Sequence, residues 1–284
     1  MSTDRDQSYR LSNKDYKYLC QHVYESTGIV LGDNKREMVY RRLTRIIRER
    51  KLASFSAYCE LLKSCPEQEH NYFINKITTN LTSFYRESHH FDFLAQQELP
   101  RLLSKGLHNN RLRIWSSASS TGEEAYSIAI TLLEAFGHFI KRCDVKILAT
   151  DIDSNVLTTA DKGIYEARKM DGVSAKLKQK YFHKGVADNA NHVKVSDELR
   201  QLITFKELNL LGEWPMKGPF DVIFCRNVII YFDKPTQEEL FARLHDILKP
   251  GGLLILGHSE NLGSYQQYFE NVARTIFRKL TVQG

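Results

Sequence analysis

The segment Phe220–Asp233 constrains the fold more than any other part of this 284-residue sequence. It reads FDVIFCRNVIIYFD, and residues 222–224 form an apolar, β-branched run that is typical of a strand buried on both faces. The run ends in the polar residues Arg226 and Asn227, and Tyr231 follows closely. In open parallel sheets, ligands bind in the crevice outside the carboxyl ends of the strands. The segment therefore predicts a buried strand with a ligand site at its end.

Strand and helix patterns alternate from residue 111 to the end of the chain. Helices are expected after Gly122, Asp153 and Pro235, where capping or turn residues precede periodic apolar residues. This alternation predicts an α/β fold, a doubly wound Rossmann-like domain over residues 111–284. Its strands are expected at residues 112–116, 145–150, 203–208, 221–225, 253–258 and 275–280.

Residues 163–202 interrupt the alternation. Residues 181–183 and 192–195 have the composition of short strands, and the turn-rich segment 187–191 lies between them. The interruption is longer than a crossover between parallel strands requires. We therefore expect a small antiparallel β subdomain inserted here.

Residues 1–77 carry helical rather than strand periodicity and predict a small all-α domain. Ser12 and Asp15 are expected to begin the first helix and Gly28 to end it. Residues 78–110 are expected to form a linker and connecting helix that contribute to a cofactor site. A second helix would carry four apolar residues on one side and three arginines on the other: Val39, Leu43, Ile46 and Ile47 against Arg41, Arg45 and Arg48.

Charge and cysteine content narrow the class of protein. The chain has 40 Lys and Arg against 34 Asp and Glu, a net charge of +6, and residues 34–51 alone carry an equal excess of basic residues. The 5 cysteines form no CxxC pair, so neither a disulfide framework nor a zinc site is expected. No signal peptide and no membrane-spanning apolar stretch is recognised, and we expect a cytoplasmic protein without direct membrane insertion.

Acidic residues follow the first two expected strands of the α/β domain. The loop 116–122 lacks the glycines of a dinucleotide-binding turn, and Glu123 and Glu124 after it would repel phosphate. A ligand with a cationic group fits better, such as the amino-acid end and sulfonium of S-adenosylmethionine, although the two acids could simply favour a helix start. Asp151 is expected to accept ribose hydroxyls, as it also would in an NAD enzyme, and Asp153 to cap a helix.

The polar run at residues 78–87 precedes a helix expected to start near His89. Considered alone, this run is an interdomain linker with a helix cap. His89 and His90 have no acidic or cysteine residues at metal-ligand spacing, so we expect structural roles for them and no metal site. The turn at residues 249–252 is assigned no chemistry.

Five motifs together resemble the chemotaxis receptor methyltransferase family, CheR, whose members are protein-glutamate O-methyltransferases. The similarity covers nearly the whole chain, including the helical domain and the β insertion. A serine-rich loop replaces the more alanine-rich loop expected of the family, which puts the shape of the pocket in doubt there. The motifs are TTNLTSFYRE (78–87), WSSASSTGEEAYSIAI (115–130), ATDID (149–153), FDVIFCRNVIIYFD (220–233) and LKPGGLLILGHSEN (248–261).

The resemblance implies methyl transfer from S-adenosylmethionine to glutamate side chains on the cytoplasmic domains of transmembrane chemoreceptors, with S-adenosylhomocysteine as the product, in chemotactic adaptation. It implies that Arg86 and Tyr231 lie closest to the methyl group, although Arg86 could equally bind only the cofactor. It also implies that the β subdomain docks a carboxy-terminal receptor peptide and that Arg41, Arg45 and Arg48 align a glutamate-rich receptor helix. The implied cofactor contacts are Asn80, Thr82, Arg86, Glu124, Asp151, Asn209, Leu210, Arg226 and Asn227.

Two other classes of protein are weaker alternatives. A noncatalytic nucleic-acid-binding regulator would use the arginine face of residues 34–51, but the sequence lacks interleaved aromatics and any recognised nucleic-acid motif. An NAD-dependent oxidoreductase is disfavoured by the missing glycine-rich turn. Glutamate methylation, in contrast, needs neither triad nor metal, because the attacking carboxylate is already ionised at neutral pH.

Overall fold

The structure is a computed structural model that describes residues 9–64, 67–107 and 110–281. It forms two compact units. The first contains the chain up to Thr79 together with Tyr231–Asp233, and the second contains Asn80–Ile230 and Lys234 onward. Within the described residues, no helix is long and apolar enough to cross a membrane.

The first unit is helical, as its sequence periodicity predicts. Ser12 caps the first helix, where its Oγ accepts a hydrogen bond from the backbone N–H of Asp15 at 3.1 Å. Gly28 ends that helix with a φ of 71°, a left-handed conformation that glycine adopts at little steric cost. The helices are α1 (Asn13–Thr27), α2 (Arg36–Glu49), α3 (Phe55–Lys63) and α4 (Glu67–Ile77), with a 3-10 turn at Asp33–Lys35.

Helix α2 has the two faces that its sequence predicts. Its apolar residues Val39, Leu43, Ile46 and Ile47 are completely buried, while Arg41, Arg45 and Arg48 are exposed. We call these three exposed arginines the arginine stripe.

Arg42 has a different role from its neighbours in α2. It donates hydrogen bonds to the carbonyl oxygens of Ile77 and Thr78 and to Thr79 Oγ1. Carbonyls at the end of a helix have no partner within the helix. Arg42 therefore fixes the end of α4 and the residues just before Asn80.

The segment Tyr231–Asp233 belongs to the helical unit although it follows the strand β7 (Phe220–Cys225) in sequence. The carbonyl of Tyr231 accepts a hydrogen bond from the N–H of Val30 at 2.8 Å, and Phe232 forms a β-bridge with Ile29. The hydroxyl of Tyr24 donates to Asp233 Oδ2 at 2.9 Å. These contacts anchor the segment to the end of α1 and the loop after it.

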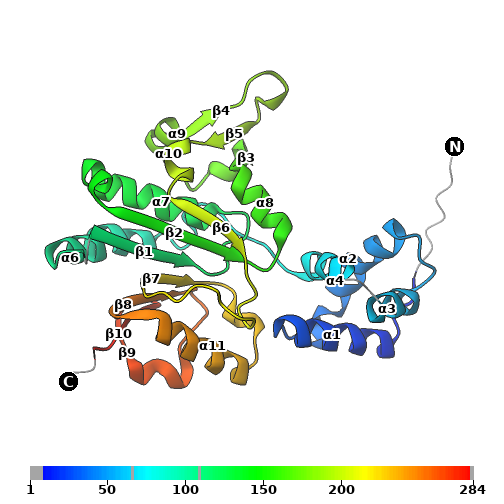
Figure 1. Cartoon of the computed structure of the whole chain (residues 1–284). Coiled ribbons are helices and arrows are strands. Elements are labelled where there is room, and N and C mark those ends of the chain that lie inside the picture. The colour runs from blue at the N-terminus through cyan, green and yellow to red at the C-terminus, as the bar shows by residue number, and fades with distance from the viewer. Residues whose placement is uncertain (1–8, 65–66, 108–109, 282–284) are drawn as a thin grey trace. The chain divides into compact units, whose positions relative to one another are not determined.

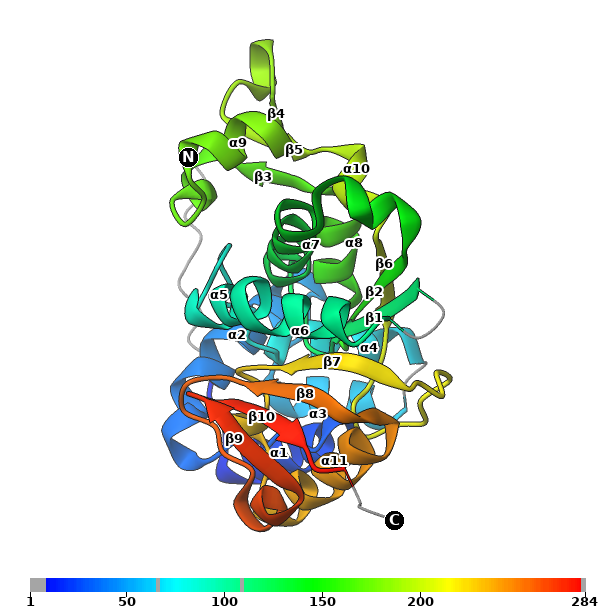
Figure 2. The same ribbon diagram turned by 90° about the vertical axis from the view of Figure 1, so that its left-hand side faces the viewer.

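The second unit is built on a seven-stranded sheet with the order β6-β2-β1-β7-β8-β10-β9 (Figure 2). The first five strands in this order are parallel, and β10 is antiparallel to both β8 and β9. The predicted strands are confirmed. The bounds are β1 Arg111–Ser116, β2 Asp144–Asp151, β6 Ile203–Glu207, β7 Phe220–Cys225, β8 Leu248–Leu256, β9 Phe269–Ala273 and β10 Ile276–Lys279.

Two features of the sheet differ from the sequence-based expectation. Strand β9 was not predicted, because it is short and its burial depends on pairing with β10. The turn expected at residues 249–252 lies inside β8 instead, because Leu248 already pairs with Phe220 and the register shifts before Leu253 pairs with Val222.

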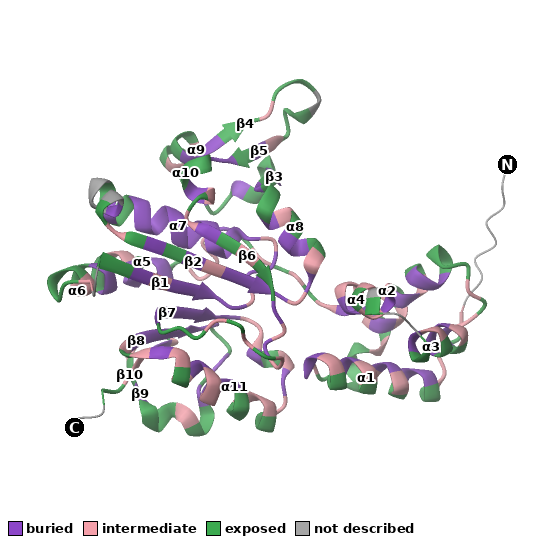
Figure 3. Cartoon of the chain, viewed as in Figure 1, coloured by how far each residue is buried: buried purple, intermediate pink, exposed green. Residues whose placement is uncertain are grey.

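Helices cover the sheet, and the core lies between them and the strands (Figure 3). All six residues of β7 are buried, as a central parallel strand requires. Helices α7 and α8 pack against β2 and β6, and α11 packs against β8. The helices are α5 (His89–Phe93), a π-helical turn (Leu94–Glu98), α6 (Leu99–Ser104), α7 (Glu123–Phe136), α8 (Ser154–Lys162) and α11 (Lys234–Ile247).

The insertion is a separate three-stranded antiparallel sheet, drawn at the top of Figure 1. Its order is β3-β5-β4, so β3 and β4 are its edge strands. The rings of Tyr165 and Phe182 pack edge-on against Phe84, which links this sheet to the segment before α5. Strand β3 was not predicted. The elements are β3 (Ile164–Glu166), α9 (Ala175–Tyr181), β4 (Phe182–Lys184), β5 (His192–Val195) and α10 (Asp197–Arg200).

Candidate active site

The site lies where the strand order reverses. The chain runs from β1 to β2 on one side, whereas β7 pairs with β1 on the other. Loops at the carboxyl ends of two such strands diverge and leave a crevice for ligands. Here the loops are joined at their base, because the N–H of Ser117 donates to the carbonyl of Phe224 at 2.9 Å.

Asp151 ends β2 and is buried, with 8% of its surface exposed. Its Oδ2 accepts the N–H of Ser120 at 2.8 Å and its Oδ1 accepts the N–H of Asp153 at 3.0 Å. Burial raises the pKa of this carboxyl to about 6, although backbone hydrogen bonds, including those from Asp153 and Ser120, lower it in part. Each oxygen keeps a lone pair, so the carboxylate can accept further hydroxyl donors.

Arg226 and Glu124 form a buried ion pair in which Arg226 Nη1 lies 2.7 Å from Glu124 Oε2. The other oxygen of Glu124 accepts the hydroxyl of Ser116 at 2.7 Å. Arg226 Nη2 donates to the carbonyl of Arg86, and the Arg226 side chain is only 1% exposed. The sequence suggested that Glu124 meets a cationic ligand; in the structure its charge is already balanced by Arg226.

Glu123 does not share this environment. It is fully buried at the start of α7, and its carboxylate binds Lys169 Nζ at 3.0 Å and the Thr121 hydroxyl at 2.6 Å. Gly122 just before it has a φ of 94°, and a Cβ there would lie 2.7 Å from Ala160 Cβ. A glycine is therefore needed for close packing of this turn on α8.

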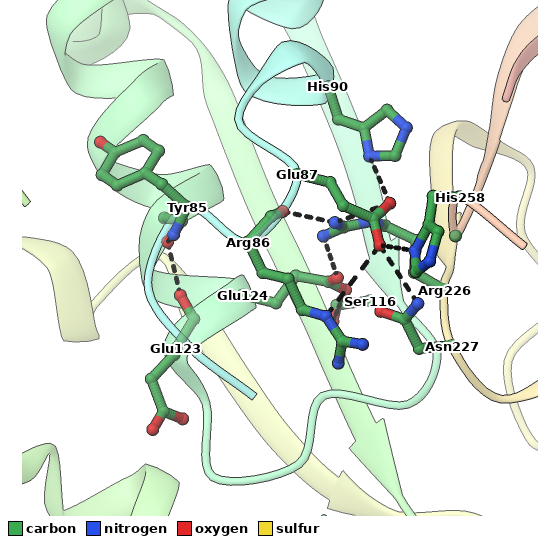
Figure 4. Close-up of polar contacts among 12 residues, drawn as sticks. Tyr85, Arg86, Glu87, His90, Ser116, Glu123, Glu124, Arg226, Asn227 and His258 are labelled. Atoms are coloured by element: carbon green, nitrogen blue, oxygen red, sulfur yellow. Dashed lines mark hydrogen bonds and ion pairs between the residues drawn. The ribbon is translucent and has the colours of Figure 1, made fainter. Parts of the chain in front are cut away.

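Glu87 was not predicted as a site residue, yet its carboxylate contacts several site residues (Figure 4). It accepts a hydrogen bond from Asn227 Nδ2 at 3.2 Å and contacts His258 Nδ1 at 3.0 Å. Its second oxygen lies 3.3 Å from Arg226 Nη2. In the sequence, Glu87 is marked only by its place in the motif at residues 78–87. Its neighbours in sequence do not indicate which residues its side chain contacts.

Glu260 is a second site residue that the sequence did not reveal. Its buried carboxylate accepts N–H groups from Gly257 at 2.6 Å and from Asn227 and Ile229 at 2.9 Å each. Asn227 has a φ of 58°, which is uncommon outside glycine. A Cβ on Gly257 would lie 2.8 Å from Glu260 Oε2. Glu260 therefore holds the backbone of the loop after β7.

Asn80, Thr82 and Arg86 precede α5 and belong to the same compact unit as the sheet. Asn80 Nδ2 donates to Asp153 Oδ2 at 2.7 Å, and the Asn80 carbonyl accepts the hydroxyl of Ser120 at 3.1 Å. Thr82 is partly exposed. Asn80 therefore lies beside the loop that contacts Asp151.

The side chain of Arg86 is 31% exposed. Its Nη1 donates to the carbonyl of Leu81 at 2.8 Å, and its Nε lies 4.0 Å from Glu87 Oε1. Within the described residues, Nη1 and Nε account for the contacts of this guanidinium. It can therefore still donate to a ligand.

Asn209 and Leu210 follow β6, and Leu208 just before them donates its N–H to the carbonyl of Asp151 at 2.9 Å. Asn209 Oδ1 accepts the N–H of Leu211 at 3.0 Å, which closes a tight turn, and Leu210 is buried. This turn therefore lies next to the end of β2. Tyr231 and the arginine stripe, in contrast, belong to the helical unit.

The acid predicted to cap α8 does so, since Asp153 Oδ1 accepts the N–H of Asn155 at 2.9 Å. His90 is buried and its Nε2 lies 2.8 Å from Thr275 Oγ1, as expected of a structural histidine. The described residues contain no group of three or more His, Cys, Asp or Glu that could hold a metal ion. Four described cysteines are unpaired, and Cys65 lies outside the described residues.

The residues present fit S-adenosylmethionine. Among the described residues, no Lys or Arg pairs with the buried carboxylate of Asp151, which suits neutral hydroxyl donors such as those of ribose. The nearby Ser119 Oγ is buried without a hydrogen-bond partner in the described part of the chain. Exposed donors on Arg86 suit the carboxylate at the amino-acid end of the cofactor.

Comparison with known proteins identifies the family. Residues 14–78 match "CheR methyltransferase, all-alpha domain", and residues 80–278 match "CheR methyltransferase, SAM binding domain". "Chemotaxis protein methyltransferase 2" of Pseudomonas aeruginosa is 44% identical over 96% of this chain and 95% of its own length. The "Chemotaxis protein methyltransferase" of Klebsiella aerogenes is 45% identical (94% and 90%), and that of Escherichia coli is 42% identical (94% and 91%).

Similarity to solved structures is more distant. An S-adenosylmethionine-dependent methyltransferase from Mesorhizobium loti aligns with a TM-score of 0.28 at 17% identity, over 58% of this chain and 54% of that one. The family matches, in contrast, cover both units from residue 14 to residue 278. The chain belongs to the CheR family of chemotaxis protein methyltransferases and carries its S-adenosylmethionine-binding domain.

Proposed function

We propose that this protein methylates specific glutamate side chains on the cytoplasmic domains of chemoreceptors and forms glutamyl methyl esters. The observation that carries the proposal is the cluster of buried Glu124 and Arg226 with partly buried Glu87 beside Arg86, where both acids are already engaged by protein groups. Such a site supplies orientation rather than a free general base. It suits an acceptor that is already ionised, as glutamate is at neutral pH.

The residues at the strand ends are proposed to hold the cofactor. Asp151 accepts the ribose hydroxyls, while Asn209 and Leu210 contribute further to the pocket. Asn80, Thr82 and Arg86 bind from the segment before α5. The remaining proposed contacts are Glu124, Arg226 and Asn227, and the buried Arg226 side chain favours contact through its backbone.

The proposed chemistry is a direct displacement. S-adenosylmethionine supplies a methyl group on a sulfonium, and in-line attack by a glutamate oxygen forms the ester bond while the electron pair of the breaking S–C bond returns to sulfur. Arg86 orients the incoming carboxylate through charge-assisted hydrogen bonds, and Tyr231 donates a hydrogen bond beside it. Because no proton is transferred in the displacement, rate enhancement rests on alignment and on exclusion of water.

Two surfaces are proposed to recognise the receptor. The arginine stripe on α2 attracts a glutamate-rich receptor helix, and such complementary charge mainly speeds association and fixes orientation. The edge strands β3 and β4 are proposed to add a carboxy-terminal receptor peptide as a further strand. Each surface can be tested without disturbing Asp151.

The test is incubation of the protein with S-adenosylmethionine and purified chemoreceptor cytoplasmic domains, followed by peptide mapping by tandem mass spectrometry. The proposal expects one added methyl group per modified glutamate. Arg86→Ala and Tyr231→Phe should reduce turnover at saturating cofactor while the fold is retained. Methylation confined to other residue types, or wild-type turnover in both variants, would contradict the proposal.

A further inference from the structure

Glu87 joins three segments that are far apart in sequence. It lies in the turn before α5, its partners Arg226 and Asn227 follow β7, and His258 follows β8. The carbonyl of the adjacent Arg86 also accepts a hydrogen bond from Arg226 (Figure 4). The Glu87 side chain is 11% exposed, so these contacts are mostly shielded from water.

The joined segments have unusual backbone conformations. Tyr85 and Glu87, on either side of Arg86, have φ angles of 54° and 58°, and Asn227 has 58°. Non-glycine residues with positive φ persist only where surrounding contacts hold them, and they concentrate at functional sites. Arg86 therefore sits in a turn whose shape depends on tertiary contacts, and the Glu87 carboxylate provides several of them.

The surroundings of Glu87 favour its ionised form and make it a weak proton acceptor. Burial alone would raise the pKa of its carboxyl, but the hydrogen bond from His258, the charge of Arg226 and the hydrogen bond from Asn227 outweigh burial and lower the pKa to about 2. A carboxylate with so low a pKa is a weak base near neutral pH. Its fixed negative charge instead pairs with Arg226, whose side chain is 1% exposed and is shared with Glu124.

We propose that Glu87 is a positioning residue that ties the Arg86 turn to Arg226 and Asn227, and thereby sets the orientation of the cofactor contacts on both segments. The inference rests on the proposed function, because those contacts are part of it. Glu87 itself does not touch the reacting atoms. Its removal would leave the hydrogen bond from Arg226 to the Arg86 carbonyl to hold the Arg86 turn to the loop after β7, so the two segments would be less firmly oriented.

The test compares Glu87→Gln with Glu98→Gln. Glu98 is a matched control, because it is likewise an acid shielded from water and paired with arginine: Arg101 Nη2 lies 2.5 Å and Arg278 Nη2 2.8 Å from its oxygens. Glu98 makes no contact with the proposed cofactor residues in the described part of the chain. Any general effect of removing a buried charge should therefore appear in both variants.

Three quantities are measured for each folded variant: the Kd of S-adenosylhomocysteine by calorimetry, and kcat and KM for receptor at saturating cofactor. In Glu87→Gln, the Kd should rise about tenfold or more, as expected when charge-assisted hydrogen bonds are lost. Its kcat should fall further than its KM changes, because alignment is impaired. Glu98→Gln should keep wild-type Kd and kcat even if its melting temperature falls.

A Kd and kcat of Glu87→Gln within twofold of the wild type, or changed no more than in Glu98→Gln, would overturn the positioning role. If Glu87→Gln does not fold, His258→Ala tests the positioning role instead. His258 is half exposed, and its replacement by alanine removes one contact to Glu87. A severalfold fall in its kcat supports the proposal, and an unchanged kcat overturns it. Failure of the wild type itself to bind S-adenosylhomocysteine or methylate receptor would instead refute the proposed function.

Discussion

Asp151 gives the most detailed prediction, because its burial affects both folding and ligand binding. Burial raises the pKa of this carboxyl from 3.8 to about 6. A rise of about 2 in pKa means that the ionised group costs the folded state about 3 kcal/mol. Because the folded pKa is the higher one, this cost is absent below pH 4, grows as pH rises toward 6, and is fully present above pH 6.

Asp151→Asn should separate stability from affinity. At pH 7.5 the substitution removes the cost of the buried charge, but its amide has only one oxygen for the N–H groups of Ser120 and Asp153. One buried N–H then loses its acceptor, which costs about 1–3 kcal/mol, so the free energy of unfolding should change little. Each lost charge-assisted bond from a ribose hydroxyl is worth about 1.5–3 kcal/mol, or about a 10- to 150-fold rise in Kd.

Two assays test this reasoning: denaturant unfolding at pH 7.5, and calorimetric titration with S-adenosylhomocysteine between pH 5 and pH 8. Wild-type Kd should rise by up to about tenfold per pH unit below pH 6, because the hydroxyls bind the ionised carboxylate. Asp151→Asn should bind S-adenosylhomocysteine weakly at every pH, and its Kd should not show the pH dependence that titration of Asp151 gives the wild type. A folded variant with wild-type Kd at pH 7.5 would refute the assignment of Asp151 to the ribose.

Three further predictions concern other parts of the molecule. Glu260→Gln should leave at least one buried N–H without an acceptor, at a cost of about 1–3 kcal/mol, but burial raises the pKa of the Glu260 carboxyl, so loss of its charge offsets part of this cost at pH 7.5; a rise in the free energy of unfolding, or a fall beyond about 3 kcal/mol, would contradict this. Replacement of all three stripe arginines by glutamate should raise the KM for receptor at low salt and weaken the salt dependence of that KM, while the affinity for S-adenosylhomocysteine stays unchanged. Wild-type receptor kinetics in this variant would show that the stripe has no role in receptor recognition. Proline at an edge strand should block a receptor peptide. Glu166 has a φ of −63° that proline accepts. Its N–H faces away from β5, and so does the N–H of Lys184 on the other edge strand. Peptide affinity retained in both Glu166→Pro and Lys184→Pro would exclude strand addition.

Much of the fold could be predicted because its signals are local. The apolar face of α2 follows from the 3.6-residue period, and Val39, Leu43 and Ile46 are all fully buried as predicted. The strand β7 is apolar except for Asp221 and stops at Arg226, so both its burial and its position at the site follow largely from composition. Strands β3 and β9 were missed because they are short and depend on partners elsewhere in the chain.

The internal organisation of the site could not be predicted in the same way. Glu87 and Asn227 are 140 residues apart in sequence, and only the fold brings their side chains together. Glu124 could be identified near the site, but its pairing with Arg226 depends on the contact between the loops after β1 and β7. Arg42 was counted with the basic residues of its helix, whereas its bonds to Ile77 and Thr78 arise from packing of α2 on α4.

The most direct test of the central claim is transfer of labelled methyl from S-adenosylmethionine to membranes that contain chemoreceptors, followed by treatment with alkali. Methyl esters of glutamate are hydrolysed by base, so the account predicts label on the receptor that alkali releases as methanol. Transfer should require this protein and should fall in Arg86→Ala. Absence of label on the receptors, or label that resists alkali, would contradict the account.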